Sequence, residues 1–264
     1  MKIALMSDVH AEFYRGEPNW LPPLPDNPDV LVLAGDIHVG KSLIDFVQRI
    51  SNALPTTHIV FIAGNHEFYR QYRKRTLKVY SEAFVGHNMI HFLENDYVDI
   101  SGVRFIGATL WTDFPPHLPE HAPEKVMAYA KENMSDFSLI ADESDTLKAF
   151  TPAIAKKLFD ESKAEISKIL AQSNPAKCVV VTHFPPAKQI LNPLYPPDLA
   201  TSYFTADCLD VVNIYQPAYW FYGHNHWSAQ TSIGSTQLVS NQFCYPNERW
   251  KTGATFYPDC CILI

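Results

Sequence analysis

The sequence contains little cysteine, and its cysteines are irregularly spaced. Five occur in 264 residues, and no two have the Cys-x-x-Cys spacing of structural zinc sites and redox motifs. An odd number without regular spacing argues against a disulfide framework. We therefore expect reduced thiols in a cytoplasmic protein.

Long basic runs and long apolar runs are also lacking. The longest basic run is Arg73-Lys74-Arg75 and the net charge is −7, so no strongly basic footprint for nucleic acid is visible. The apolar residues before Ser7 are too few for the core of a signal peptide, and no stretch approaches the length of a membrane span. We expect a soluble protein that is neither exported nor embedded in a membrane.

Hydrophobic residues make up 47% of the chain and charged residues 19%, which is enough apolar material for a sizeable core. Candidate metal ligands are spread from Asp8 to His226, so a division into two domains would separate them. We therefore expect a single domain over residues 1–264, with an insertion of loops and helices at roughly 113–150.

Five short apolar runs end in side chains that bind metals. Runs of this kind, often β-branched, are typical of strands buried on both faces of an α/β sheet, whose ligand crevice lies beyond the carboxyl ends of the strands. Polar side chains at several such ends can converge on one crevice. The five ends are Asp8-Val9-His10, Gly35-Asp36, Gly64-Asn65-His66-Glu67, His183 and Gly223-His224-Asn225-His226.

The residue types at these ends indicate a metal site without thiolate. In an extended segment Asp8 and His10 point the same way, so both can reach one ion. The carboxylate of Asp36 has two oxygens and can bridge two ions. Carboxylate, amide and imidazole ligands favour Mn²⁺, Fe or Zn²⁺, and two such ions would clamp a phosphoryl oxygen and generate a bridging hydroxide.

The order of the predicted elements indicates an α/β fold with two mixed sheets. Strands and helices alternate up to residue 84, which favours parallel strands joined by crossover helices. A hairpin pattern follows, and more strands come after His226. We predict helices over 41–53, 70–84, 125–134, 152–171 and 206–215, and strands over 30–33, 59–62, 90–93, 97–100, 103–111, 179–181, 229–233, 237–240, 255–257 and 260–264. Pro152 suits the first turn of its helix, with Thr151 as N-cap.

Taken in order, these motifs resemble those of the calcineurin-like metallophosphoesterases, and the resemblance spans most of the chain. It implies a four-layer α-β-β-α sandwich of two mixed β-sheets flanked by helices. It also implies two metal ions, a phosphoester substrate and catalytic roles for Asp36 and His66, the latter as a proton donor to the leaving group. By the same resemblance one ion is held by Asp8, His10, Asp36 and His226, and the other by Asp36, Asn65, His183 and His224.

The sequence departs from the protein Ser/Thr phosphatases of that family. Val39 and Gly40 stand where those enzymes have an Asp that orients the catalytic histidine and an Arg that grips phosphate, and Ala63 replaces a second Arg. The closing Gly-His-Asn-His is more like the phosphodiesterase and nuclease branches. A small phosphodiester or phosphomonoester is therefore the expected substrate, and the residue that orients His66 is left unassigned.

Two alternatives remain open. A nuclease would need a basic track for the backbone, which Arg70, Arg73, Lys74, Arg75 and Lys78 could supply only locally. A non-catalytic scaffold of the same fold should have lost a ligand or the outer histidine, and neither is missing.

Several further residues are candidates for substrate contact. Asn65 and His66 are the first two, from their motif. His38 follows Asp36 by two positions, and Asp113 lies in a loop after a predicted strand.

Overall fold

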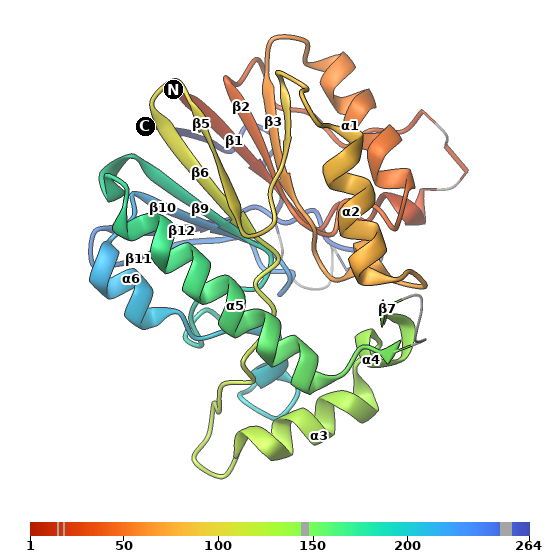
Figure 1. The fold of residues 1–264 in the computed structure, drawn as a ribbon, viewed down its shortest axis with the longest axis vertical. Helices are drawn as coiled ribbons and strands as arrows, with labels where there is room; N and C mark the ends of the chain where they lie inside the picture. The colour runs from red at the N-terminus through yellow and green to blue at the C-terminus, as the bar shows by residue number, and fades with distance from the viewer. Residues whose placement is uncertain (15, 18, 144–147, 249–254) are drawn as a thin grey trace.

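The computed structural model describes residues 1–264 except 15, 18, 144–147 and 249–254. Two large sheets pack face to face, with helices on their outer sides (Figure 1). The first sheet has the strand order β13-β1-β2-β3-β4 and the second has the order β11-β12-β10-β9-β6-β5. This arrangement confirms the predicted four-layer sandwich.

Both sheets are mixed. In the first, β1 to β4 run parallel and β13 is antiparallel to β1. In the second, β6, β9, β10 and β12 run parallel, while β5 and β11 are antiparallel edge strands. The strands are β1 (Lys2–Met6), β2 (Val30–Ala34), β3 (His58–Ile62), β4 (Ile90–Phe92), β5 (Asp96–Ile100), β6 (Val103–Ala108), β9 (Cys178–Thr182), β10 (Tyr219–Tyr222), β11 (Ala229–Ile233), β12 (Thr236–Ser240) and β13 (Cys261–Leu263).

The helices cover the outer faces of the sheets. Figure 1 shows α1 and α2 outside the first sheet, α5 and α6 outside the second, and α3 and α4 at one end of the molecule. They are α1 (Ser42–Ala53), α2 (Arg73–Ala83), α3 (Pro123–Asn133), α4 (Asp136–Leu139), α5 (Pro152–Ala171) and α6 (Leu209–Tyr215). Short 3₁₀ turns lie at Ala11–Phe13, His66–Phe68, Pro175–Lys177 and Thr201–Phe204. Within the part of the chain that the structure describes, we find no helix with the length and apolar character to span a bilayer.

The alternation of side chains along the strands explains the four layers. In β2, Val30 and Val32 point into the core between the sheets, while Leu31 and Leu33 point toward the helices. Every one of these residues is fully buried. Both faces of the central strands are thus covered, which is why their sequences are continuous apolar runs.

Residues 113–150, the expected insertion, contain α3, α4 and a small pair of strands, β7 (Ala141–Glu143) and β8 (Lys148–Ala149). Arg73 of α2 pairs with Asp142 at 2.7 Å and so ties this segment to the first half of the chain. Because β13 pairs with β1, we keep the proposal that residues 1–264 form one domain.

Three local predictions need correction. The strand predicted over 103–111 ends at Ala108, because Leu110 has a left-handed backbone that interrupts the extended chain. Residues Thr255–Tyr257 form no strand, since the side chain of Asn241 takes both backbone groups of Tyr257 in place of a partner strand. The helix predicted from Arg70 begins at Arg73, because Arg70 itself has a positive φ of 58°.

The N-cap prediction is confirmed. The Thr151 hydroxyl accepts a hydrogen bond from the Ile154 amide at 3.3 Å, and Pro152 occupies the first turn of α5. The cap satisfies one of the amides that the first turn of a helix leaves without an intrahelical partner.

The close approach of the two sheets predicts a cost for any side chain at Gly107 of β6. A Cβ there would lie 2.5 Å from the Leu93 Cβ and 2.8 Å from the Ile62 Cγ2. We expect Gly107→Ala to lower the free energy of unfolding by about 1–3 kcal/mol through overpacking, measured by urea denaturation. Gly16→Ala is the control, because a Cβ at Gly16 meets nothing within 4 Å. Equal stability of the two variants would contradict this packing.

Candidate metal centre and active site

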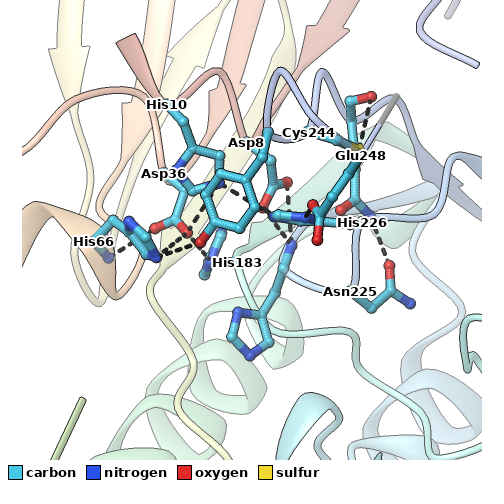
Figure 2. Close-up of polar contacts among 12 residues, drawn as sticks. Asp8, His10, Asp36, His66, His183, Asn225, His226, Cys244 and Glu248 are labelled. Carbon is cyan, nitrogen blue, oxygen red and sulfur yellow. Dashed lines mark hydrogen bonds and ion pairs between the residues drawn. The ribbon is translucent and has the colours of Figure 1, made fainter. Parts of the chain in front are cut away.

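The seven predicted ligands come together at the carboxyl ends of strands from both sheets. Figure 2 shows side chains from residues far apart in the sequence, among them Asp8, Asp36, His183 and His226, gathered in one place. Asp8 and His10 follow β1, Asp36 follows β2 and Asn65 follows β3. His183 follows β9 directly, and His224 and His226 follow β10. The parallel direction of these strands is what brings their ends to one edge.

Five of these residues have left-handed backbone conformations, with φ of 52° at Asp8, 50° at His10, 54° at Asp36, 73° at His224 and 50° at His226. The expectation that Asp8-Val9-His10 continues as extended chain is therefore wrong, although both side chains still reach one site. Asp and His tolerate this region better than most residues, but repeated use of it stores strain of the kind found at functional sites.

Two glycines allow the carboxylates to approach closely. A Cβ on Gly64 would lie 2.2 Å from Asp36 Oδ1, and one on Gly223 would lie 2.5 Å from Asp8 Oδ2. Gly64 and Gly223 therefore each leave room for the carboxylate of a predicted ligand that follows another strand.

The buried carboxylate of Glu67 holds two of the strand-end loops together. It accepts hydrogen bonds from the amides of Asp36 (3.0 Å), Ile37 (2.7 Å) and Gly64 (2.8 Å). Burial and the charge of Asp36 raise its pKa to about 8, against the opposing effect of His183 and these amides. Glu67 thus fixes the loop that carries Asp36 to the loop that carries Asn65 and His66.

The ligand atoms form two groups. Asp8, His10 and His226 make one, and Asp36, His183 and His224 make the other; within each group the ligand atoms lie within 4.8 Å of one another. The Oδ2 atom of Asp36 lies 3.9 Å from His10 Nε2 and 3.4 Å from His183 Nε2, so this carboxylate faces both groups.

In the first group, hydrogen bonds to the Nδ1 atoms of His10 and His226 determine which ring nitrogen is available to bind a metal ion. His10 Nδ1 lies 3.3 Å from Glu12 Oε1, and His226 Nδ1 lies 2.5 Å from Glu248 Oε2. Each Nδ1 therefore carries the proton that it donates, and in the neutral ring each Nε2 is left with a lone pair. These two Nε2 atoms are only 3.2 Å apart, so their lone pairs repel unless a proton or a metal ion lies between them.

In the second group, ring nitrogens of His183 and His224 are likewise available to bind a metal ion. His183 Nδ1 donates to the Ala34 carbonyl at 3.0 Å, so in the neutral ring the Nε2 atom presents a lone pair toward Asn65 Oδ1, 3.0 Å away. His224 Nε2 is buried and, in the described structure, has no hydrogen-bond partner. An acceptor-rich, buried cluster of this kind fits a divalent cation.

The neighbouring carboxylates favour the protonated form of two of these histidines. Burial alone would lower the pKa of His226, but the hydrogen bonds to Asp8 and Glu248 and their charges outweigh it and raise the pKa to about 10. Burial also opposes the charged form of His183, yet Asp36 and Asp8 raise its pKa to about 9. The site therefore has a strongly negative potential, which attracts cations.

A network behind Asn65 fixes the direction of its amide. The Nδ2 group donates to Asp136 Oδ1 at 2.9 Å, which turns Oδ1 toward His183. Asp136 also accepts hydrogen bonds from the hydroxyls of Tyr69 (2.8 Å) and Tyr203. Asp136 lies at the start of α4, within the predicted insertion. Its hydrogen bond thus orients the amide oxygen of Asn65 toward the second group.

The outer histidine, His66, has two partners. Its Nδ1 lies 3.2 Å from Glu12 Oε1, and its Nε2 lies 2.9 Å from the Tyr245 hydroxyl. Burial opposes the charged form, but the charges of Asp36 and Glu12 and the hydrogen bond to Glu12 raise the pKa of His66. Burial would also raise the pKa of Glu12, yet His10 and His66 hold it at about 2. Glu12 therefore takes the place of the orienting aspartate that this sequence lacks.

His10, Glu12 and His66 form a third cluster of possible ligand atoms. Glu12 Oε1 faces the Nδ1 atoms of both rings, which are the nitrogens that donate protons to it. This cluster is better explained as a carboxylate that orients two histidines than as a further ion site.

The structure does not bring His38 or Asp113 into the pocket beside the ligands. His38 lines a separate small hollow of about 110 Å³ with Tyr14, Trp20 and Phe46. Asp113 accepts a hydrogen bond from the Asp207 amide at 3.0 Å, and burial raises its pKa to about 6. Substrate contact by these two residues stays a prediction without support from their positions.

A pocket of about 440 Å³ opens onto the ligands. At the ligand end it is lined by Asp36, Asn65, His66, His224 and His226, with Tyr245 and Glu248 beside them. Its outer walls come from residues 133–136 and 191–204. Four of the seven predicted ligands and the outer histidine therefore face a cavity large enough for a small molecule.

Residues 1–228 match the family model described as calcineurin-like phosphoesterase. This match covers most of the chain, and the chain belongs to that family. It is accordingly a metal-dependent phosphoesterase, as the motifs predict.

Known proteins are similar over nearly the whole chain. An uncharacterized protein of Acanthamoeba polyphaga mimivirus is 28% identical over 273 aligned residues, which cover 92% of this chain and 91% of that protein. The phosphopantetheinyl hydrolase of Mycobacterium tuberculosis has a similar structure, with a TM-score of 0.74 at 20% identity, covering 95% of this chain and 92% of that one. A protein of Thermus thermophilus has a TM-score of 0.52 at 11% identity, covering 91% and 88%. These two structures share the fold.

Sequence reasoning missed four residues that touch the predicted site. Glu12 continues the i, i+2 spacing of Asp8 and His10, so a signal for it was available. Asp136, Tyr245 and Glu248 lie outside the strand-end motifs, and the last two lie beyond the 228 residues that match the family model. Their roles depend on tertiary packing alone.

The network behind Asn65 predicts weaker metal binding when Asp136 is lost. Asp136→Ala frees the amide to rotate, and we expect the affinity for Mn²⁺ to fall about 10- to 100-fold, measured by isothermal titration calorimetry. Asp142→Ala removes another buried carboxylate of the same segment, which pairs with Arg73, and controls for general destabilisation. Unchanged Mn²⁺ affinity in Asp136→Ala would contradict the role given to Asp136.

Proposed function

We propose that this protein hydrolyses small phosphoesters at a centre of two divalent metal ions. Asp8, His10, Asp36 and His226 would hold one ion. Asp36, Asn65, His183 and His224 would hold the other. The observation that carries the proposal is the position of Asp36, whose Oδ2 faces both groups of buried acceptors.

The donor set suits Mn²⁺, Fe or Zn²⁺, because it combines carboxylate, amide and imidazole without thiolate. A pair of such ions supplies Lewis acidity, which activates water as a nucleophile and stabilises charge on the phosphoryl oxygens. Asp36 would keep the two ions at a fixed separation, and its pKa supports this role. Burial would raise that pKa, but His183 and His66 hold it well below its usual value.

His66 would supply the proton that the leaving group needs. Glu12 holds Nδ1 and so aims Nε2 into the pocket, where Tyr245 is its partner. The raised pKa favours the imidazolium, and the proton would pass from Nε2 to the oxygen of the departing alcohol as the P–O bond breaks. The substrate would displace the Tyr245 hydroxyl from His66 Nε2 when it binds.

The shape of the site favours a small substrate over nucleic acid. The ligands lie at the end of a walled pocket rather than along an open track. Of the basic residues near α2, Arg73 pairs with Asp142, Lys74 with Glu143 and Lys78 with Glu82. Three of the five basic residues in that patch are thus paired with acids, which weakens the nuclease alternative. A scaffold role is equally unsupported, since every ligand position is filled.

Loss of a shared ligand should abolish hydrolysis. We expect Asp36→Asn and Asn65→Ala each to lower kcat/KM for bis(p-nitrophenyl) phosphate with Mn²⁺ at least about 100-fold, while circular dichroism shows a folded chain. Asp45→Asn and Asn213→Ala change the same residue types on the exposed faces of α1 and α6 and serve as matched controls. Undiminished turnover by either site variant would refute the assignment.

The role of His66 predicts a dependence on the leaving group. An alkoxide needs a proton more than a nitrophenolate does, so His66→Ala should reduce the rate on an alkyl phosphate ester more, by roughly 10²- to 10⁴-fold. Steady-state kinetics on matched aryl and alkyl esters measures the difference, with His87→Ala, an exposed histidine, as control. Equal losses on both esters would point to substrate binding instead.

A further inference from the structure

The pocket continues outward from the ligand end between two segments of the chain. One is the junction of α3 and α4, and the other is the loop before α6. We call this outer part the arm subsite, defined by Met134, Leu191, Tyr195, Asp198, Thr201 and Phe204.

The arm subsite begins directly at the metal centre. The ring of Phe204 lies 5.2 Å from the ring of His224, a proposed ligand of the second ion. At the outer end Tyr195 is 53% exposed and its neighbour Leu194 is 52% exposed. A group attached to phosphorus would therefore extend along an apolar wall that runs from the ions to the surface.

The wall is braced by hydrogen bonds within its own loop. The Asp198 carboxylate accepts from the Thr201 amide at 2.7 Å, and the Thr201 hydroxyl accepts from the Asp198 amide at 2.7 Å. Asn192 donates to the Asn225 carbonyl at 3.3 Å, which ties the loop to the Gly-His-Asn-His segment. A wall formed before the ligand arrives reduces the entropy lost on binding.

The charges in the pocket discriminate against a second anion. Asp198 lies in the arm subsite, Asp136 lies behind Asn65, and Glu248 lies beside His226. No lysine or arginine lines the pocket among the residues that the structure describes. The two ions and His66 would accommodate one phosphoryl group, and in the arm subsite any further phosphate or carboxylate on the substrate would meet the carboxylate of Asp198.

We propose that the substrate carries a single phosphoryl group joined to an uncharged, mainly apolar arm, and that the arm subsite binds this arm. The inference rests on the proposed function. The volume of about 440 Å³ exceeds what a phosphoryl group needs and falls in the range of pockets that enclose a whole small ligand. Asn133 and Ser135 also line the pocket and bring an amide and a hydroxyl group to it, so the arm would carry a few neutral hydrogen-bonding groups of its own.

A matched series of p-nitrophenyl phosphodiesters tests the proposal. The second ester group is methyl, a long arm that ends in a neutral acetamide, or an arm of the same length that ends in a carboxylate. With Mn²⁺ we expect kcat/KM to rise roughly tenfold from methyl to the neutral arm, mainly through KM, and to fall by a similar factor for the carboxylate arm.

Three variants test whether the dependence of kcat/KM on the ester arm arises in the arm subsite. Tyr195→Ala should raise KM for the neutral arm more than for the methyl ester. Asp198→Asn keeps an acceptor for the Thr201 amide and should narrow the gap between the carboxylate and neutral arms. Tyr97→Ala, which removes an exposed tyrosine from β5, is the matched control and should change neither ratio.

The outcomes separate this inference from the proposed function. If none of the three diesters is hydrolysed with Mn²⁺, Fe²⁺ or Zn²⁺, both the function and the inference fail. If the methyl ester is hydrolysed but the neutral arm gives no gain, or the carboxylate arm is preferred, the arm subsite is overturned and the phosphoesterase assignment stands.

Discussion

The centre of this protein is an electrostatic conflict that a cation resolves. His10 and His226 direct their Nε2 atoms at each other because Glu12 and Glu248 hold their outer nitrogens, so a proton or a metal ion must lie between the two rings. His183 Nε2 likewise lies 3.0 Å from the amide oxygen of Asn65. Buried acceptors without donors are costly, and several of them in one place make sense as the coordination shell of positive ions.

The surrounding fold is organised to hold that shell in place. Two sheets end at the same edge, and backbone hydrogen bonds join them there, from Ser7 to Asn241 at 3.2 Å and from Phe243 to Ser7 at 2.9 Å. Glu67 fixes neighbouring loops of the first sheet, and glycines leave room for the carboxylates. The left-handed backbone at the ligands is the strained part, and the packed sheets on either side maintain it.

Much of this could be predicted from the sequence, for identifiable reasons. The strands buried on both faces are continuous apolar runs, so their positions and the ligands at their ends are visible without a structure. The cap at Thr151 follows from local chemistry alone. The conformation of Asp8 and His10 was missed, because nothing in a short polar segment distinguishes extended from left-handed backbone. The contacts of Asp136 and Tyr245 were also hidden, because each depends on how a loop folds back over the sheets.

The segment after residue 228 adds contacts to the site from outside the region that matches the family model. Tyr245 covers His10, with ring centroids 4.2 Å apart, and its hydroxyl meets His66, while Glu248 orients His226. The proposed metal ligands all lie within the matched region, whereas these covering residues lie outside it. The outer walls of the pocket, which would select the substrate, likewise come from loops.

Anomalous diffraction from Mn²⁺-soaked crystals tests the central claim most directly. The account predicts two peaks on either side of Asp36, one among Asp8, His10 and His226 and the other among Asn65, His183 and His224. A lack of peaks at saturating Mn²⁺, or a single peak beside Glu12 and His66, would contradict it.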